Sequence, residues 1–204
     1  APSHSFNINS NFTLDSLGKK VILNFDYFTH KDDRNRENVS RFFDSNGSEN
    51  EEKFNANNNV GVQAIKNYSG KIDIEFPLKF AKLEFGGRLS ITNTDNDNYA
   101  FDLSSGAPVF VTDLANSFQF QENTQALYFS INKKIKDKWE SQLGLRLENT
   151  LTEGYSKTEQ QRNRNTYTRV FPTANIIFIP NDTHSYSLSI NSRIQRPSFE
   201  FLNP

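Results

Sequence analysis

Charged side chains recur at every second position of several segments whose intervening residues are apolar. Asp73 and Glu75 alternate with isoleucine and phenylalanine, and Arg146 and Glu148 alternate with leucine. In an extended strand, this alternation puts the charges on one face. Charges on a shielded face must be paired or hydrated, so we expect ion pairs between neighbouring strands. We favour a structural role for these pairs over direct contact with a substrate. The predicted charge network comprises Asp73, Glu75, Arg88, Arg146, Glu148 and Arg193.

Residue types that carry catalysis or bind metals are few and scattered. The chain has no cysteine, and its histidines, His4, His30 and His184, lack the spacing of a metal site. No nucleophile elbow, phosphate-binding loop or dinucleotide fingerprint occurs in the sequence. Asp95 and Asp97 offer oxygen ligands that calcium accepts, but their neighbours specify no further ligands. We therefore predict no catalytic residue, no metal site, no cofactor and no enzymatic activity.

A third group of residues consists of aromatic side chains in polar surroundings. Nineteen Phe and seven Tyr stand against one Trp and no Met, and some of these aromatics fall in long polar segments that we predict to be loops. Such rings can stack on a sugar, a siderophore or a peptide, or they can hold the loops against the rest of the protein. The candidate ligand-binding residues are Phe42, Phe43, Tyr99 and Phe101.

The elements that position these residues are β-strands. Apolar and polar residues alternate over about ten residues at a time, which indicates strands with one apolar face, and no segment shows comparable helical periodicity. The predicted strands are Ser5–Leu14, Val21–His30, Tyr68–Phe76, Lys82–Thr92, Phe118–Asn132, Trp139–Leu151, Thr166–Ile179 and Ser185–Arg196. The fold class is therefore all-β, an antiparallel up-and-down meander of about eight long strands.

The connections between these strands alternate between short and long. Short polar turns are predicted at Asp15–Lys20, Lys79–Ala81, Lys134–Lys138 and Asn181–His184. Long polar loops are predicted at Lys31–Asn59, Asn93–Ser117 and Glu153–Asn165. A meander with this order carries its short turns at one end and its long loops at the other, which is typical of transmembrane β-barrels.

Alternation alone does not separate a membrane barrel from a soluble sandwich, because both have strands with one apolar and one polar face. Strand length favours the barrel, since about ten residues cross a bilayer at a tilt and globular strands average about five or six. Aromatic residues near the strand ends, such as Tyr27, Phe76 and Trp139, also favour it. The polar face would then line the interior of the barrel.

The overall composition excludes some classes of function and suggests a fragment. A net charge of -1 without a basic run gives no basis for binding nucleic acid. The chain has neither an initiator Met nor a signal peptide, and Pro197 and Pro204 bracket a segment that reads as another loop. We therefore treat residues 1–204 as one segment of a larger barrel. Its two open edges are expected to pair either with each other or with the edges of a second copy.

Several short motifs resemble the outer-membrane β-barrels of TonB-dependent receptors, of the type common in Bacteroidetes. The motifs are Asp73 with Pro77 at a strand end, Leu83–Gly86 at a strand start, Gly144–Glu148, the pair Phe171 and Pro172, and the terminal Arg196–Ser198 with Leu202–Pro204. The resemblance implies a barrel of about 22 strands around a plug domain, located in the bacterial outer membrane.

The resemblance also implies a function and partners. It predicts a receptor that binds and imports a scarce nutrient, such as a siderophore or a glycan. The partners would be outer-membrane lipid, the protein's own plug domain, an inner-membrane energy-coupling complex and the small-molecule or glycan ligand. Two alternatives remain open at this point: a self-contained eight-stranded barrel with a structural or adhesive role, and a soluble β-barrel or sandwich that binds a ligand.

Overall fold

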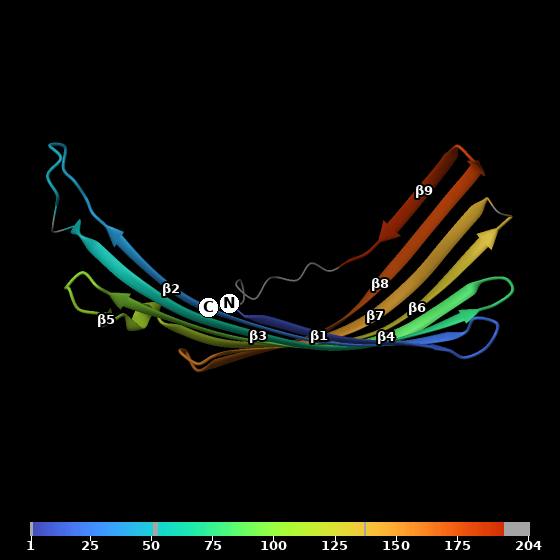
Figure 1. Cartoon of the computed structure of the whole chain (residues 1–204), viewed down its shortest axis with the longest axis horizontal. Helices are drawn as coiled ribbons and strands as arrows, with labels where there is room; N and C mark the ends of the chain where they lie inside the picture. The colour runs from blue at the N-terminus through green and yellow to red at the C-terminus, as the bar shows by residue number, and fades with distance from the viewer. Residues whose placement is uncertain (1, 51–52, 137, 194–204) are drawn as a thin grey trace.

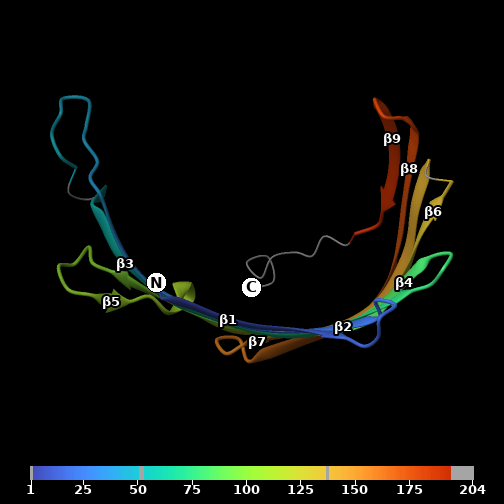
Figure 2. The ribbon, with the colours of Figure 1, turned by 45° about the vertical axis from the view of Figure 1, so that its right-hand side comes forward.

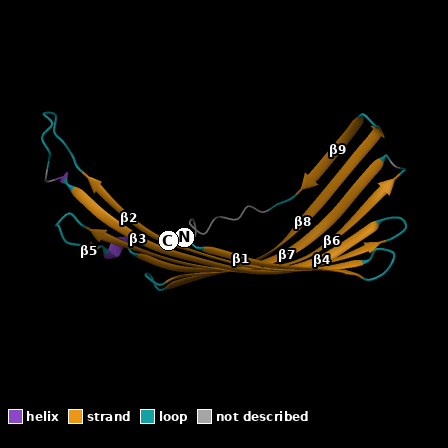
Figure 3. Cartoon of the chain, viewed as in Figure 1, coloured by secondary structure: helices purple, strands orange, loops and turns teal. Residues whose placement is uncertain are grey.

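The computed structural model describes residues 2–50, 53–136 and 138–193. It forms one antiparallel sheet (Figures 1 and 3). The strands are β1 (Ser3–Thr13), β2 (Lys20–Ser40), β3 (Asn55–Pro77), β4 (Lys82–Asp102), β5 (Val109–Phe110), β6 (Asn116–Ile135), β7 (Trp139–Ser156), β8 (Gln161–Asn181) and β9 (His184–Asn191). The predicted all-β meander is confirmed, because each long strand pairs with the next and the short β5 pairs only with β4.

The sheet is a single curved layer with one concave and one convex face (Figure 2). The connections from β1 to β2 (14–19), β3 to β4 (78–81), β6 to β7 and β8 to β9 (182–183) lie at one end of the sheet (Figure 1). The connections from β2 to β3, β4 to β6 (103–115) and β7 to β8 (157–160) lie at the opposite end, and the second of these contains β5 and the 3-10 helix η2 (Thr112–Leu114). The predicted alternation of the two ends is confirmed, but the predicted difference in length holds only for the first two connections at the second end, because β7 and β8 are joined by four residues. Within the described ranges, no helix is long and apolar enough to cross a membrane.

The predicted boundaries of the long loops are wrong. β2 continues through residues 31–40, β3 begins at Asn55 and β4 continues to Asp102. The third predicted loop shrinks to residues 157–160. These strand extensions are rich in Asn and Asp, which strands disfavour on average, so the sequence pattern indicated loops. Continuous backbone pairing holds them extended, as where Asn38 lies opposite Asn57 and their side-chain amides are 3.0 Å apart.

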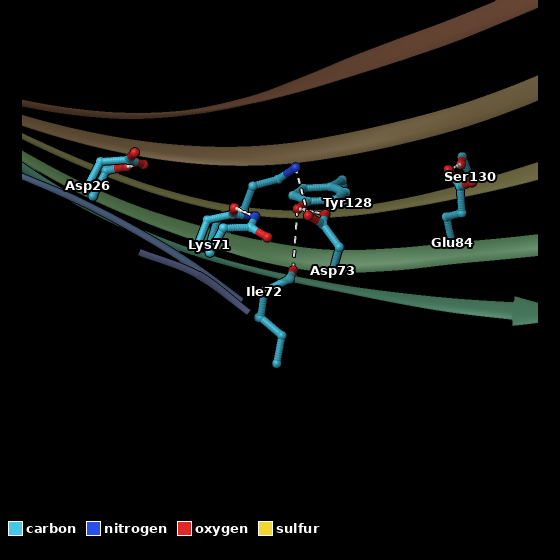
Figure 4. Close-up of polar contacts among 10 residues, drawn as sticks. Asp26, Lys71, Ile72, Asp73, Glu84, Tyr128 and Ser130 are labelled. Carbon is cyan, nitrogen blue, oxygen red and sulfur yellow. Dashed lines mark hydrogen bonds and ion pairs between the residues drawn. The ribbon is translucent and has the colours of Figure 1, made fainter. Parts of the chain in front are cut away.

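The two faces of the sheet differ in polarity. The convex face carries an apolar row that crosses the sheet from strand to strand, Phe12, Val21, Ile74, Phe85, Phe129, Leu145 and Pro172. Figure 4 shows polar side chains on the concave side and Ile72 on the opposite side. A soluble barrel would turn its apolar face inward, so the convex apolar face favours a wall whose outer surface contacts lipid.

The apolar belt runs obliquely across the strands. On β4 the outward apolar residues extend from Leu83 to Ile91, but Asn123 lies opposite Ile91 on β6, where the apolar series already ends at Leu127. The belt therefore ends four residues earlier on β6 than on the adjacent β4. An apolar belt that runs obliquely to the strands is expected where tilted strands cross a bilayer.

The turn between β1 and β2 is organised by Asp15. Its carboxylate accepts hydrogen bonds from the backbone N–H groups of Leu17 and Lys19, both at 3.0 Å, and the Lys19 ammonium lies 3.1 Å away. Gly18 takes the left-handed conformation that this tight turn requires, with φ +88°. The hydrogen bond from the Lys19 N–H holds the pKa of Asp15 below its usual value. The stabilisation is therefore present at neutral pH and is lost as pH falls through that lowered pKa.

The two outer strands remain open within the described part of the chain, because β1 and β9 pair only with β2 and β8. Pro172 lies within β8 although proline has no backbone N–H to donate. Its carbonyl accepts a hydrogen bond from the N–H of Ser192, so this residue faces the β9 side of the strand, where the pairing with β9 ends at Asn191. Proline is tolerated at such a position because no paired strand lacks a donor there. The predicted last strand is shorter than expected, as β9 ends at Asn191. The predicted loop at Arg196–Pro204 lies outside the described residues.

Candidate functional site

The concave face of β3, β4 and β7 carries a set of ion pairs. Lys71 lies 2.7 Å from Asp73 on β3, and Lys82 lies 3.0 Å from Glu75 and 2.8 Å from Glu84. The alternation of charge and apolar residue along each strand is what brings these groups to one face. The register then sets Glu75 opposite Glu84, and Lys82 compensates the repulsion between the two carboxylates.

A second ion pair lies on β7. The Arg146 guanidinium donates to Glu148 through two nitrogens, at 2.9 and 2.6 Å. Only 7% of Glu148 is exposed, so this carboxylate is shielded from water even in a sheet of one layer. A shielded carboxylate is costly without a partner, and the two-nitrogen contact from Arg146 compensates that cost.

Tyr128 connects these two groups of charges. It lies on β6 opposite Gly86, and its ring passes over β4 so that its hydroxyl donates to Asp73 on β3 (Figure 4). The passage requires a glycine, because a Cβ at position 86 would lie 2.7 Å from the Tyr128 hydroxyl. The Lys71 ammonium and the Arg146 guanidinium lie 5.9 and 5.7 Å from the ring centre, so both cations are within cation–π distance of this ring.

We name the residues Lys71, Asp73, Tyr128, Arg146 and Glu148 the concave cluster. Its carboxylates, hydroxyl and cations satisfy one another across four adjacent strands, β3, β4, β6 and β7. Tyr128 is the member of the cluster that reaches both other strands, through its hydrogen bond to Asp73 and through the Arg146 guanidinium beside its ring. The chemistry of the cluster is therefore that of a charged inner wall.

The structure brings most of the predicted charge network together. Asp73, Glu75, Arg146 and Glu148 all form ion pairs on the concave face. The expectation that such pairs join neighbouring strands is wrong for Asp73 and for Glu148, because their partners Lys71 and Arg146 lie two residues away on the same strand; the pair of Glu75 with Lys82 does join two strands. Arg88 lies on that face opposite Lys71 and Ala126, but forms no ion pair with a described residue. Arg193 lies past the end of β9, is exposed and likewise forms no ion pair among the residues described. The predicted placement of Arg193 on the last strand is wrong.

Sequence reasoning missed the connecting role of Tyr128 and the double pairing of Lys82. The signal for Tyr128 was its position on the polar face of a strand. Its partners Gly86 and Asp73 lie on other strands, so only the register reveals the contact.

The predicted loop aromatics divide into two groups. Phe42 and Phe43 lie in the connection 41–54 and are 48% and 62% exposed. Tyr99 and Phe101 lie on β4, not in a loop, and their ring centres are 6.4 and 5.6 Å from that of Phe110 on β5. The pairing of β5 with β4 explains this correction, since it fastens the loop to the strand.

The carboxylates of Asp95 and Asp97 accept hydrogen bonds from side chains of β6. Gln119 donates to Asp95 at 2.8 Å, and Ser117 donates to Asp97. Among the residues that the structure describes, no group of three or more His, Cys, Asp or Glu is arranged to hold a metal ion.

This fold is similar to that of known outer-membrane proteins. Residues 12–204 match the model of the outer membrane protein beta-barrel family. Among solved structures, the chain resembles the ferripyoverdine receptor of the outer membrane of Pseudomonas aeruginosa (TM-score 0.66, 15% identity, 92% of this chain and 26% of that one). It also resembles the siderophore receptor PiuA from Acinetobacter baumannii (0.64, 19%, 92% and 31%) and the ferric citrate transporter FecA (0.59, 12%, 93% and 26%).

The chain thus spans about a quarter to a third of the length of these receptors and transporters. No curated protein has a significantly similar sequence. At such low identity the solved structures show the fold alone, and the resemblance inferred from the short motifs is confirmed at that level. Because the family model matches nearly all of the sequence, the chain belongs to the outer membrane protein beta-barrel family, whose place is the outer membrane.

Proposed function

We propose that this chain is part of the wall of a TonB-dependent receptor that binds and imports a scarce nutrient, such as a siderophore or a glycan. The observation that carries the proposal is the likeness of at least 92% of the chain to structures of siderophore receptors and a ferric citrate transporter. In this proposal the full-length protein supplies a plug domain and the contact with an inner-membrane energy-coupling complex. The concave cluster faces the plug and keeps the wall rigid.

Import is tested with cells that produce the full-length receptor. They are given a panel of radiolabelled ferric siderophores and fluorescent oligosaccharides, beside cells that lack the energy-coupling complex. We expect one member of the panel to accumulate only when the complex is present. If no member accumulates in a coupling-dependent way, nutrient import by this receptor is contradicted for the panel's ligand classes.

Phe42 and Phe43 are the aromatic residues best placed to contact that nutrient, since they lie exposed in the connection 41–54. We expect Phe43→Ala to weaken binding of the imported ligand about tenfold, because a stacked ring contributes about 0.5–1.5 kcal/mol beyond the area that it buries and a tenfold change in affinity corresponds to about 1.4 kcal/mol. Phe80→Ala is the matched control, because Phe80 is 63% exposed but lies in a turn at the opposite end of the sheet. If the Phe43→Ala and Phe80→Ala variants bind the ligand with equal affinity in an equilibrium assay, Phe43 is not part of the binding site.

Tyr99 and Phe101 were also candidates for ligand contact, and their packing against Phe110 makes them the weaker ones. In this proposal they hold the connection 103–115 against β4. The same binding assay separates the two roles, since a Tyr99→Ala variant with unchanged affinity has lost only a structural contact.

In this proposal, the lengths of the connections assign each end of the sheet to one side of the outer membrane. Longer loops face outward from the cell in such barrels, and short turns face the periplasm. Because the chain has no cysteine, Ser45→Cys in the connection 41–54 and Ser16→Cys in the turn 14–19 add single labelling sites above the background of the parent protein. A membrane-impermeant maleimide is expected to label Ser45→Cys on intact cells. Ser16→Cys should react only after the outer membrane is permeabilised, and the reverse pattern would contradict this orientation.

A further inference from the structure

Asp44 organises a tight turn in the connection 41–54, which projects past the end of the sheet (Figure 1). Its carboxylate accepts hydrogen bonds from the backbone N–H groups of Asn46 and Ser48, both at 2.9 Å. Its backbone carbonyl accepts a third hydrogen bond, from the N–H of Gly47 at 3.1 Å. One residue therefore holds the backbone of the whole turn in place.

This turn contains the only asparagine–glycine pair in the sequence, Asn46 and Gly47. Asn46 is exposed, and its side-chain amide forms no hydrogen bond with a residue that the structure describes. Gly47 takes the left-handed conformation with φ +82°, and a Cβ at this position would meet no atom within 4 Å. Asparagine is a chemically labile residue, because its side-chain carbonyl carbon can be attacked by the backbone nitrogen of the next residue. A side chain on that next residue hinders the attack, and Gly47 has none.

We propose that this turn is a site of spontaneous deamidation, at which Asn46 is converted to aspartate and isoaspartate. The backbone nitrogen of Gly47 gives its proton to solvent base and attacks Cγ of Asn46. The new C–N bond closes a succinimide ring, the bond from Cγ to Nδ2 breaks, and the former amide nitrogen takes up a proton from water and leaves as ammonia. Water then opens the ring at either of its carbonyl groups. No electrons are transferred, and water is the only co-reactant.

Asp44 restrains this reaction. The N–H of Gly47 that must be deprotonated is engaged with the Asp44 carbonyl, so the nitrogen becomes available only when the turn opens. The two hydrogen bonds to the Asp44 carboxylate oppose that opening. Exposed loops open locally at far lower free energy than the whole protein unfolds. The rate of conversion therefore follows the population of the open turn.

A second exposed turn provides an internal reference. The side-chain oxygen of Asn181 accepts hydrogen bonds from the backbone N–H groups of Thr183 and His184, at 3.2 and 2.9 Å. The residue after Asn181 is Asp182, which has a side chain beside the attacking nitrogen. Asn181 is therefore held by its own turn and hindered by its neighbour, so we expect it to react more slowly than Asn46.

Both products change the connection in which they form. Each adds a carboxylate next to Asp44, and isoaspartate also lengthens the main chain by one carbon atom, which the closed turn does not accommodate. Below the turn, the N–H of Asp44 donates to the carbonyl of Ser48 at 2.9 Å. The N–H of Asn50 donates to the carbonyl of Phe42 at 2.7 Å. Loosening of the turn therefore reaches the segment that carries Phe42 and Phe43. The inference itself does not depend on nutrient import.

Peptide mapping of the full-length protein tests the site. The purified protein is incubated in mildly alkaline buffer made with heavy-oxygen water, and its proteolytic peptides are analysed by mass spectrometry. Incorporated heavy oxygen marks each asparagine that was converted during the incubation. We expect Asn46 to be converted faster than any other asparagine and to yield isoaspartate as well as aspartate. Conversion at Asn46 no faster than at Asn181 would overturn the site, and aspartate without isoaspartate would overturn the succinimide step.

Two variants test the restraint by Asp44. Asp44→Ala removes both carboxylate hydrogen bonds and should speed the conversion of Asn46 about fivefold or more, because the loss of one hydrogen bond of average strength raises the open population by about that factor. Asp102→Ala is the matched control, since the Asp102 carboxylate accepts a hydrogen bond from the N–H of Ser104 at 2.8 Å in a different connection. It should leave the rate at Asn46 unchanged. Equal rates in the two variants would overturn the role of Asp44.

Discussion

Gly86→Ala is expected to destabilise the barrel strongly, although it adds one methyl group. The new Cβ would overlap the backbone carbonyl oxygen of Ile72 on β3 and lie 2.7 Å from the hydroxyl of Tyr128. Because a backbone atom cannot move without shifting the β3–β4 pairing, we expect a loss of about 3 kcal/mol, at the upper end of the cost of overpacking. The measurement is the urea midpoint, or the temperature at which the folded band disappears in gel electrophoresis of the full-length protein.

Gly144→Ala is the matched control for this prediction. A Cβ at position 144 would meet its nearest heavy atoms at 3.5 Å, which is ordinary van der Waals contact. We expect an effect near zero or a slight gain, since alanine restricts the unfolded chain more than glycine does. Equal destabilisation by both substitutions would show that glycine is needed for general strand geometry and that the close contact at Gly86 is unimportant.

A second variant separates the two contacts at Gly86. Tyr128→Ala removes the ring and hydroxyl but leaves the carbonyl oxygen of Ile72 in place. If the backbone overlap dominates, Gly86→Ala still costs stability in the Tyr128→Ala background. If the contact with the ring dominates, Gly86→Ala costs little stability in the Tyr128→Ala background. The double-mutant cycle gives the coupling free energy between the two positions.

Glu148→Gln is expected to cost about 1–3 kcal/mol of unfolding free energy. Glu148 is 7% exposed and accepts hydrogen bonds from two nitrogens of Arg146. The substitution keeps the side-chain shape but leaves the Arg146 guanidinium without its anionic partner, which is the costly way to break a shielded pair. The estimate stays below that for a fully buried pair because the Arg146 side chain is 31% exposed. Equilibrium unfolding of the full-length protein in detergent or lipid measures the loss.

Glu153→Gln on the same strand provides the control. Glu153 pairs with Arg162 at 2.9 Å, and the Arg162 side chain is 66% exposed. Exposed ion pairs contribute about 0–1 kcal/mol, so this variant should unfold nearly as the parent does. Similar losses in the two variants would argue that shielding on the concave face has little influence on the strength of these pairs.

The sequence by itself determined the strands and their two faces. Alternation at a period of two is a local property, so the residues of β3 and β7 show which side chains share a face without knowledge of any partner strand. The separation of turns from longer loops follows from chain order alone. The charged residues Asp73, Glu75, Arg146 and Glu148 were therefore predicted on the correct face.

Only the tertiary structure decided how far the strands extend and which residues meet across them. The segment 31–40 has a composition that disfavours strands, and its backbone becomes extended because β3 supplies hydrogen-bond partners along its length. The contact of Tyr128 with Asp73 passes over Gly86 and joins β6 to β3 across β4, between residues that are 55 positions apart in the sequence. The register that creates this contact depends on the pairing between strands, and so does the oblique course of the apolar belt. A single strand carries no information about the offset of its neighbour, and that is why these features were out of reach of the sequence pattern.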